Sequence, residues 1–86
     1  MTLIEVRGEL DCATVPSLEG HVDLALSEGP VVLDLRALRF MDVSGLRLAV
    51  RLEARAQLNG VAFSMLEGQG PVSRIFELTG MRRFVG

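Results

Sequence analysis

The residues that could do chemistry in this chain gather in two short polar segments. The first is Gly8-Glu9-Leu10-Asp11, and the second is Phe40-Met41-Asp42-Val43-Ser44-Gly45-Leu46. Their carboxylates, Asp11 and Asp42, could serve acid–base catalysis if they lay close together. No nucleophile–base pair accompanies them, because the single histidine, His21, falls in the middle of a predicted helix. We therefore predict that the protein is not an enzyme, and an enzyme or small-ligand carrier using both aspartates is the weakest hypothesis.

Metal and redox chemistry are also not expected. One histidine and one cysteine do not make a metal site, so we predict no metal and no cofactor. Cys12 lies beside Asp11 and could have a redox role, but we expect a small, buried apolar residue there. Because it is the only cysteine, no disulfide can form within the chain, and a reducing compartment fits.

The elements that must position the two polar segments alternate along the chain. We predict strands at 3–7, 31–35, 61–66 and 84–85, and helices at 14–27, from 44 or 45 to 59, and at 71–80. Thr14 is the expected N-cap of the first helix. The apolar run at 31–35 is typical of a strand that is buried on both faces. The alternation predicts one α/β domain spanning residues 1–86, with a small, mostly parallel or mixed four-stranded sheet and about three helices.

Both polar segments then fall at the carboxyl ends of strands, where open α/β sheets gather their functional groups. The N–H groups at the start of the second helix could stabilise an anionic group of a partner. Gly45 would let another backbone approach closely. The alternative is that Asp42 or Ser44 only caps the helix.

Composition narrows the classes of partner. The chain has 86 residues, 49% of them apolar, a net charge of −2 and no Trp or Tyr, which argues against a general nucleic-acid binder. No apolar run approaches the roughly 20 residues of a membrane span, and no signal peptide opens the chain. We expect a cytoplasmic protein without direct nucleic-acid contact or membrane insertion.

Three segments together resemble the STAS domain family, which includes anti-sigma factor antagonists. Gly8 to Asp11, followed by Ala13-Thr14, is similar to the segment that opens the first helix of that family. Phe40 to Leu46 resembles its signature loop, which reads Phe-hydrophobic-Asp-Ser-Ser/Thr-Gly-Leu. The segment from Pro71 to Met81 resembles the third-helix segment. The resemblance covers nearly the whole chain in the right order.

The resemblance implies a role in protein–protein regulation. Antagonists of this type bind an anti-sigma serine-protein kinase and so free a sigma factor, and the kinase phosphorylates the serine after the signature aspartate. The implied partner-binding residues are Asp11, Asp42, Val43, Ser44, Gly45, Leu46 and Arg47. The alternative is a STAS subunit of another assembly, such as a lipid-transport ATPase complex or a stressosome-like scaffold.

The chain departs from the family pattern at the phosphoacceptor. Val43 follows the signature aspartate and has no hydroxyl, whereas Ser44 matches the second hydroxyl position. Either the protein is not switched by phosphorylation at the usual place, or Ser44 is the phosphoacceptor. We favour the first hypothesis, because a shift of one residue changes how the hydroxyl approaches a kinase.

Two further expectations concern surfaces. Compared with the family, both ends look shortened, and an exposed sheet edge would favour a homodimer or partner docking. Arg47, Arg51 and Arg55 recur at four-residue spacing in the second helix. They form either a solvated helix face or a surface for an acidic partner.

Overall fold

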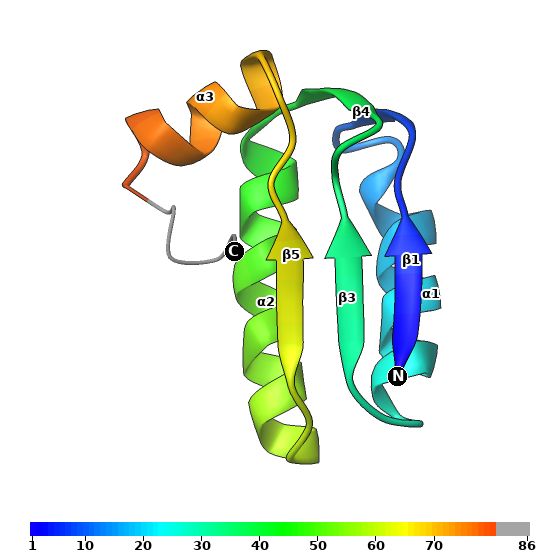
Figure 1. The fold of residues 1–86 in the computed structure, drawn as a ribbon. Helices are drawn as coiled ribbons and strands as arrows, with labels where there is room; N and C mark the ends of the chain where they lie inside the picture. Colours follow the sequence, from blue (N-terminus) through cyan, green and yellow to red (C-terminus); the bar gives the residue numbers. More distant parts are fainter. Residues whose placement is uncertain (81–86) are drawn as a thin grey trace.

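The computed structural model describes residues 1–80, and its fold is built on two sets of parallel strands (Figure 1). The main sheet has the order β1-β3-β5, with β1 (Thr2–Glu5), β3 (Val31–Asp34) and β5 (Phe63–Leu66). A second, two-stranded ladder pairs β2 (Gly8–Leu10) with β4 (Leu38–Met41). The helices are α1 (Val15–Leu26), α2 (Val43–Asn59) and α3 (Pro71–Leu78).

The predicted α/β class with three helices is confirmed, and two details differ. The predicted strand at 84–85 lies outside the described residues. Strands β2 and β4, which pair in parallel through Leu10 and Met41, were not predicted from the sequence. Their residues alternate poorly: in β4, Leu38 and Met41 are buried while Arg39 and Phe40 are exposed. A strand of four residues with two adjacent exposed side chains lacks the period-two pattern by which strands are recognised.

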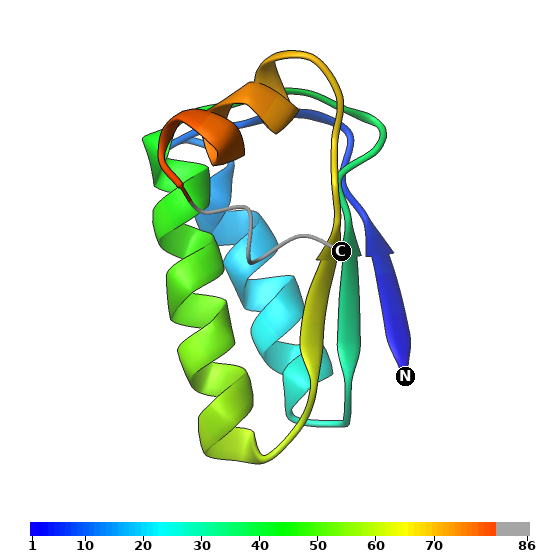
Figure 2. The same cartoon turned by 60° about the vertical axis from the view of Figure 1, so that its left-hand side comes forward.

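The sheet has helices on one face. Figure 2 shows α1 and α2 side by side on the same side of the three strands. Buried side chains of the sheet, such as Val31, Leu33 and Met65, belong to the core under these helices. No helix of residues 1–80 covers the opposite face, where Leu3 and Ser64 are exposed and Val32 is half-buried. The prediction that 31–35 is buried on both faces holds for Asp34, which is 3% exposed, but not for Val32, which is half-buried.

Ion pairs join the two helices that cover the sheet. Glu19 of α1 accepts hydrogen bonds from Nε and Nη2 of Arg51 at 3.0 and 2.9 Å, and it also pairs with Arg55 at 2.6 Å. Arg55 contacts Asp23 of α1 as well, at 2.8 Å. Two of the three arginines of the predicted stripe therefore hold α1 against α2, which neither sequence hypothesis anticipated. The arginine hydrogen bonds, led by that from Arg51, lower the pKa of Glu19 from 4.5 to about 2.

The start of α2 lies against β4 at a position that only glycine can occupy without rearrangement. A Cβ on Gly45 would lie 2.4 Å from Cγ and 2.7 Å from Sδ of Met41, and 3.2 Å from Cδ2 of Leu10. All three residues are buried. At its other end α2 stops at Gly60, which has a φ of 68° and donates its N–H to carbonyl oxygens of the last turn. This confirms the predicted helix end.

Three apolar side chains of the helices are exposed, although helical periodicity places them on the apolar faces of α2 and α3. Leu58 is 86% exposed and Val50 is 43% exposed on α2, and Leu78 is 78% exposed on α3. Each helix buries a narrower stripe than its apolar residues suggest.

The pairing of Glu19 predicts a specific loss of stability in acid. Because the pKa of Glu19 is lowered in the folded state, its contribution is complete above the unfolded value of 4.5 and is lost as the pH falls toward about 2. We expect Glu19→Gln to lower the free energy of unfolding at neutral pH by about 1–2 kcal/mol. Urea unfolding between pH 2 and 7 measures this. Arg51→Gln should remove most of the same pH dependence, and an unchanged slope in both variants would contradict the assignment.

The close contact at Gly45 predicts opposite effects for two glycine-to-alanine changes. Gly45→Ala gains roughly 1 kcal/mol of helix propensity but should lose about 1–3 kcal/mol through overpacking against Met41, a net destabilisation. Gly20→Ala is the matched control, because Gly20 is exposed in α1 and a Cβ added there would have nothing within 4 Å. Gly20→Ala should stabilise by about 1 kcal/mol. Thermal unfolding of both variants would test the pair, and a neutral Gly45→Ala would refute the packing argument.

Candidate functional site

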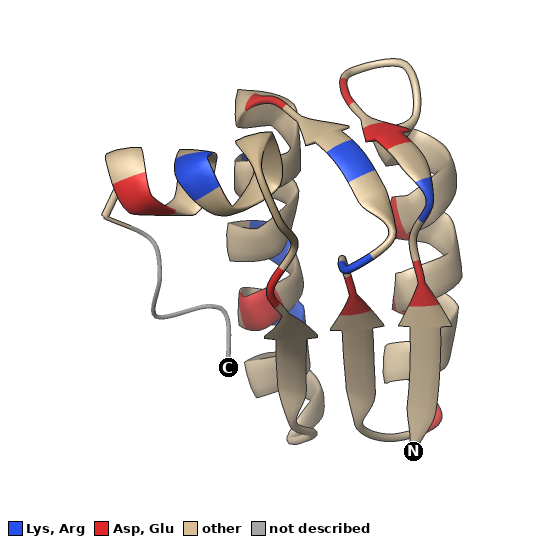
Figure 3. Cartoon of the chain, turned by 45° about the horizontal axis from the view of Figure 1, so that its top comes forward, with Lys and Arg blue, Asp and Glu red and all other residues tan. Residues whose placement is uncertain are grey.

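The two polar segments that the sequence singled out come together at the end of the second ladder. Leu10 of β2 is paired with Met41 of β4, and the N–H of Asp42 donates to the carbonyl oxygen of Leu10 at 3.2 Å. Asp11 and Asp42 directly follow these two residues. The structure therefore confirms that both aspartates lie at neighbouring strand ends. Figure 3 views this end of the molecule, where β2 and β4 run side by side above the main sheet.

Asp42 is the N-cap of α2. Its backbone is extended, with φ −108° and ψ −170°, and its Oδ1 accepts a hydrogen bond from the N–H of Ser44 at 2.8 Å. Its carbonyl oxygen accepts from the N–H of Gly45 at 3.0 Å. A carboxylate at this position also complements the positive end of the helix dipole. The capping alternative is thus correct for Asp42, and it is compatible with a second role because the cap holds the following turn in one conformation.

Asp11 shapes the first turn in a similar way. Its Oδ1 accepts hydrogen bonds from the N–H groups of Ala13 and Thr14 at 2.9 and 3.1 Å. Thr14 stands at the predicted N-cap position, but its side chain makes no capping bond to the helix. Its hydroxyl instead donates to the carbonyl oxygen of Glu9 at 3.0 Å and accepts from the N–H of Asp11 at 2.9 Å. The expectation that Cys12 is buried was wrong, since it lies exposed in this turn.

The predicted partner-binding residues divide into a surface set and a buried set. Val43, the first residue of α2, is 50% exposed, and Arg47 one turn later is also exposed. Asp11, Asp42 and Ser44 are half-buried. Gly45 and Leu46 are buried, and Leu46 is only 4% exposed. In this conformation Gly45 and Leu46 offer no surface to another protein; they position the turn by packing beneath it. The predicted close approach at Gly45 is made by Met41 of this chain.

The charges around the turn are partly neutralised within the chain. Arg39 of β4 pairs with Glu9 of β2 at 2.8 Å, and both side chains are largely exposed. At the end of β3 the buried Asp34 accepts hydrogen bonds from Nε and Nη2 of Arg36 at 3.0 and 2.9 Å, and these bonds lower the pKa of Asp34. Arg47 makes no ion pair within residues 1–80. It is the member of the arginine stripe that remains available to a partner.

The surface beside the turn was not predicted from the sequence. Phe40 is 44% exposed, although it is one of only four aromatic residues in the chain. It borders a hollow of about 370 Å³ between β4 and α3, lined also by Arg74, Ile75 and Leu78. An aromatic residue within the signature loop, in a chain that has only four, was the sequence signal that could have identified this surface.

A metal site and a membrane-spanning helix find no support in residues 1–80. Within that range no three His, Cys, Asp or Glu side chains are grouped so that they could hold a metal ion. The longest described helix, α2, has 17 residues, and none of the helices in this range has the length and apolar character to cross a bilayer. His21 lies on α1, where its Nδ1 donates to the carbonyl oxygen of Ser17 at 2.8 Å.

Comparison with known proteins gives a family and a fold. The family model described as STAS domain matches residues 1–86. An anti-sigma-B factor antagonist of Staphylococcus aureus is 31% identical over 81 residues, which cover 92% of this chain and 75% of that protein. Osmosensory protein A of Mycobacterium tuberculosis is 29% identical over 75 residues, covering 86% of this chain and 48% of that protein. The chain thus spans about half the length of one relative and three quarters of the other.

Solved structures of anti-sigma factor antagonists share the fold of this chain. The unphosphorylated form of the anti-sigma factor antagonist SpoIIAA superposes with a TM-score of 0.83 at 21% identity, covering 99% of this chain and 77% of that one. An anti-sigma factor antagonist from Mycobacterium paratuberculosis gives a TM-score of 0.81 at 26% identity, covering 94% and 70%. With the family model matching from the first residue to the last, the chain belongs to the STAS domain family.

Proposed function

We propose that this chain is an anti-sigma factor antagonist that binds an anti-sigma factor through its docking turn, defined as Asp42, Val43 and Ser44. Similarity to the Staphylococcus aureus antagonist supports the class of function. The assignment of the binding surface rests on Val43. This residue is half-exposed at the first position of α2, directly after the capping Asp42. Asp11 and Arg47, which has no ion pair within residues 1–80, flank the turn and complete the proposed surface.

The finer proposal concerns the partner. We infer an anti-sigma serine-protein kinase that also sequesters a sigma factor, so that binding of this chain in the cytoplasm frees the sigma factor. The function is binding rather than catalysis. The carboxylates of Asp11 and Asp42 are engaged with backbone N–H groups, which suits a rigid recognition surface.

We further propose that binding is not switched by phosphorylation of the turn. Val43 has no hydroxyl, and Ser44 is half-buried with its N–H donating to Asp42. A phosphate on Ser44 would bring about −1.5 to −2 charge beside the Asp42 carboxylate, which caps the same helix end. Like-charge repulsion and the loss of the cap both oppose modification at this position.

A second candidate function is a STAS subunit of another assembly, such as a lipid-transport ATPase complex or a stressosome-like scaffold. The observation that favours it is again Val43, because a module that only assembles does not require a phosphoacceptor. Direct binding to an anti-sigma factor distinguishes the two functions.

A charge at position 43 should disrupt the proposed complex. We expect Val43→Asp to weaken binding to the cognate anti-sigma factor about tenfold or more, because it adds a desolvated negative charge to the interface. Aspartate in the first turn of a helix is favourable, so the fold should remain intact. Calorimetric titration measures the affinity, and circular dichroism checks the fold.

Val43→Thr is the matched control, since it has nearly the same shape without a charge, and it should bind within a few-fold of the unmodified chain. Equal affinities for the Asp and Thr variants would remove the docking turn from its proposed role. Failure of the unmodified chain to bind would instead favour the second candidate function.

Restoring the hydroxyl should create a switch. When the chain is incubated with the cognate kinase and ATP, we expect no phosphate on Ser44, whereas Val43→Ser should be phosphorylated at position 43 and should then dissociate. Peptide mass spectrometry locates the phosphate. Stoichiometric phosphate on Ser44 of the unmodified chain would contradict the unswitched mechanism, and Ser44→Ala in the Val43→Ser background separates the two hydroxyls.

A further inference from the structure

The outer face of α2 has an unusual composition for the exposed side of a helix. We define it as Val43, Arg47, Val50 and Ala54, all of which are exposed. Val43 is 50% exposed and Val50 is 43% exposed, and Leu58, one turn beyond Ala54, is 86% exposed. The solvent side of a surface helix normally carries charged and polar residues. On α2 this side is apolar except for Arg47.

The four residues of the outer face form one continuous stripe. They follow one another at intervals of four, three and four positions, which is the spacing by which one helix packs lengthwise against another. At 1.5 Å per residue, the stripe from position 43 to position 54 is about 16 Å long. In Figure 2, α2 forms the left-hand edge of the molecule, and the three strands lie on its other side. The stripe therefore has the geometry of an unoccupied helix-packing surface.

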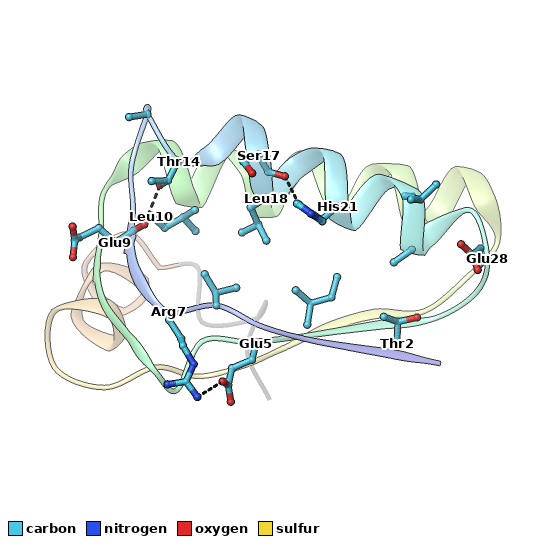
Figure 4. A pocket seen from close by; sticks show the side chains of 15 residues that line it. Thr2, Glu5, Arg7, Glu9, Leu10, Thr14, Ser17, Leu18, His21 and Glu28 are labelled. Carbon is cyan, nitrogen blue, oxygen red and sulfur yellow. Dashed lines mark hydrogen bonds and ion pairs between the residues drawn. The ribbon is translucent and has the colours of Figure 1, made fainter.

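The neighbouring helix α1 lacks such a stripe. Its exposed side carries Ser17, Gly20 and His21. Figure 4 shows His21, whose Nδ1 donates to the carbonyl oxygen of Ser17 at 2.8 Å. Among the described residues of α1, only Leu24 is a large apolar side chain in a mostly exposed position, at 67%. A single exposed leucine is ordinary at a protein surface, whereas a continuous apolar face indicates a surface for a partner.

The charge of the outer face narrows the chemistry of that partner. Arg47 makes no ion pair within residues 1–80, whereas Arg51 in the next turn is paired with Glu19. Glu53 is the single acidic residue of α2, and it is half-buried. Among the described residues, the outer face thus presents one available positive charge between two valines. A complementary surface needs a carboxylate between apolar side chains.

A second copy of this chain does not meet that requirement. Its own outer face would bring another Arg47 and no exposed carboxylate of α2. Like charges placed opposite each other in an interface oppose association. A helix of a different protein, with apolar positions and a carboxylate at matching spacing, is complementary in both shape and charge.

We propose that the outer face of α2 binds an amphipathic helix of the anti-sigma factor, which lies lengthwise along α2 with a carboxylate opposite Arg47. Apolar side chains of that helix pack against Val43 and Val50, and Ala54 allows the two helix axes to approach closely. This binding mode rests on the proposed function, because Val43 belongs to both surfaces. It extends the docking turn by Val50 and Ala54 and specifies the chemistry of the partner segment.

Two substitutions beyond the docking turn test the helix contact. Val50→Glu and Ala54→Glu each place a negative charge and a longer side chain against an acidic helix. Each should weaken binding to the cognate anti-sigma factor about fivefold or more. Calorimetric titration measures the affinities, and circular dichroism checks the fold. Glutamate is a good helix former, so both variants should fold.

Leu24→Glu is the matched control for these variants. It makes the same change of charge at an exposed position of α1, away from the outer face of α2. It should therefore bind the anti-sigma factor like the unmodified chain.

A zero-length cross-link tests the expected carboxylate. The chain has no lysine, so Arg47→Lys introduces a single side-chain amine and keeps the positive charge. A carbodiimide joins an amine to a nearby carboxylate as an amide, and Arg47→Lys should cross-link to the anti-sigma factor in this way. Peptide mass spectrometry should place the cross-linked carboxylate in a helix of the partner. Leu24→Lys, which adds its amine to α1, should form no such cross-link.

The outcomes separate this proposal from the proposed function. If Val43→Asp weakens binding while Val50→Glu and Ala54→Glu do not, the docking turn stands and the helix contact is refuted. A cross-linked carboxylate in a loop of the partner would also refute it. Self-association of the unmodified chain that Val50→Glu abolishes, measured by sedimentation velocity, would place a second copy on the outer face and overturn the proposal. If the unmodified chain binds no anti-sigma factor, the proposed function fails and the helix contact fails with it.

Discussion

The contact on which the candidate site depends is the close packing of Gly45 against Met41. Because position 45 has no side chain, the first turn of α2 lies directly on the buried face of β4 and on Leu10 of β2. Any larger residue would have to displace buried side chains. This contact sets the height of the helix start above the second ladder, and it thereby decides which residues of the turn reach the surface.

The docking turn follows from that geometry. With Gly45 and Leu46 held in the core, the preceding Asp42 caps the helix and Val43 faces outward. Parallel pairing of β2 with β4 brings Asp11 next to Asp42, although 31 positions of chain separate them. The proposed recognition surface is therefore assembled by backbone hydrogen bonds and packing. The carboxylates of Asp11 and Asp42 are held by backbone N–H groups, and such preorganisation lowers the entropic cost of binding a partner.

Charge is used in two ways in this molecule. Arg51 and Arg55 are engaged with Glu19 and Asp23, so they stabilise the helix layer rather than a complex. Arg47, on the same stripe but nearer to the turn, has no such partner within the described residues. An apparent basic surface thus separates into a structural part and an available part. The acidic partners Glu19 and Asp23 lie beyond the first turn of α1, and that first turn carries no acidic residue.

Local patterns in the amino-acid sequence were sufficient to predict the α/β class and the three helices. They also singled out the segment from Phe40 to Leu46. Periodicity, caps and family motifs are properties of neighbouring residues, so they can be recognised without the fold. The absence of a hydroxyl at position 43 can likewise be read directly from the chain. Only the tertiary structure shows that Met41 fills the space at Gly45 and that β2 pairs with β4. The same holds for the ion pairs of Arg51 and Arg55 and for the exposure of Cys12. These features depend on contacts between different elements, and no local pattern encodes which side chain of another element will occupy a given space.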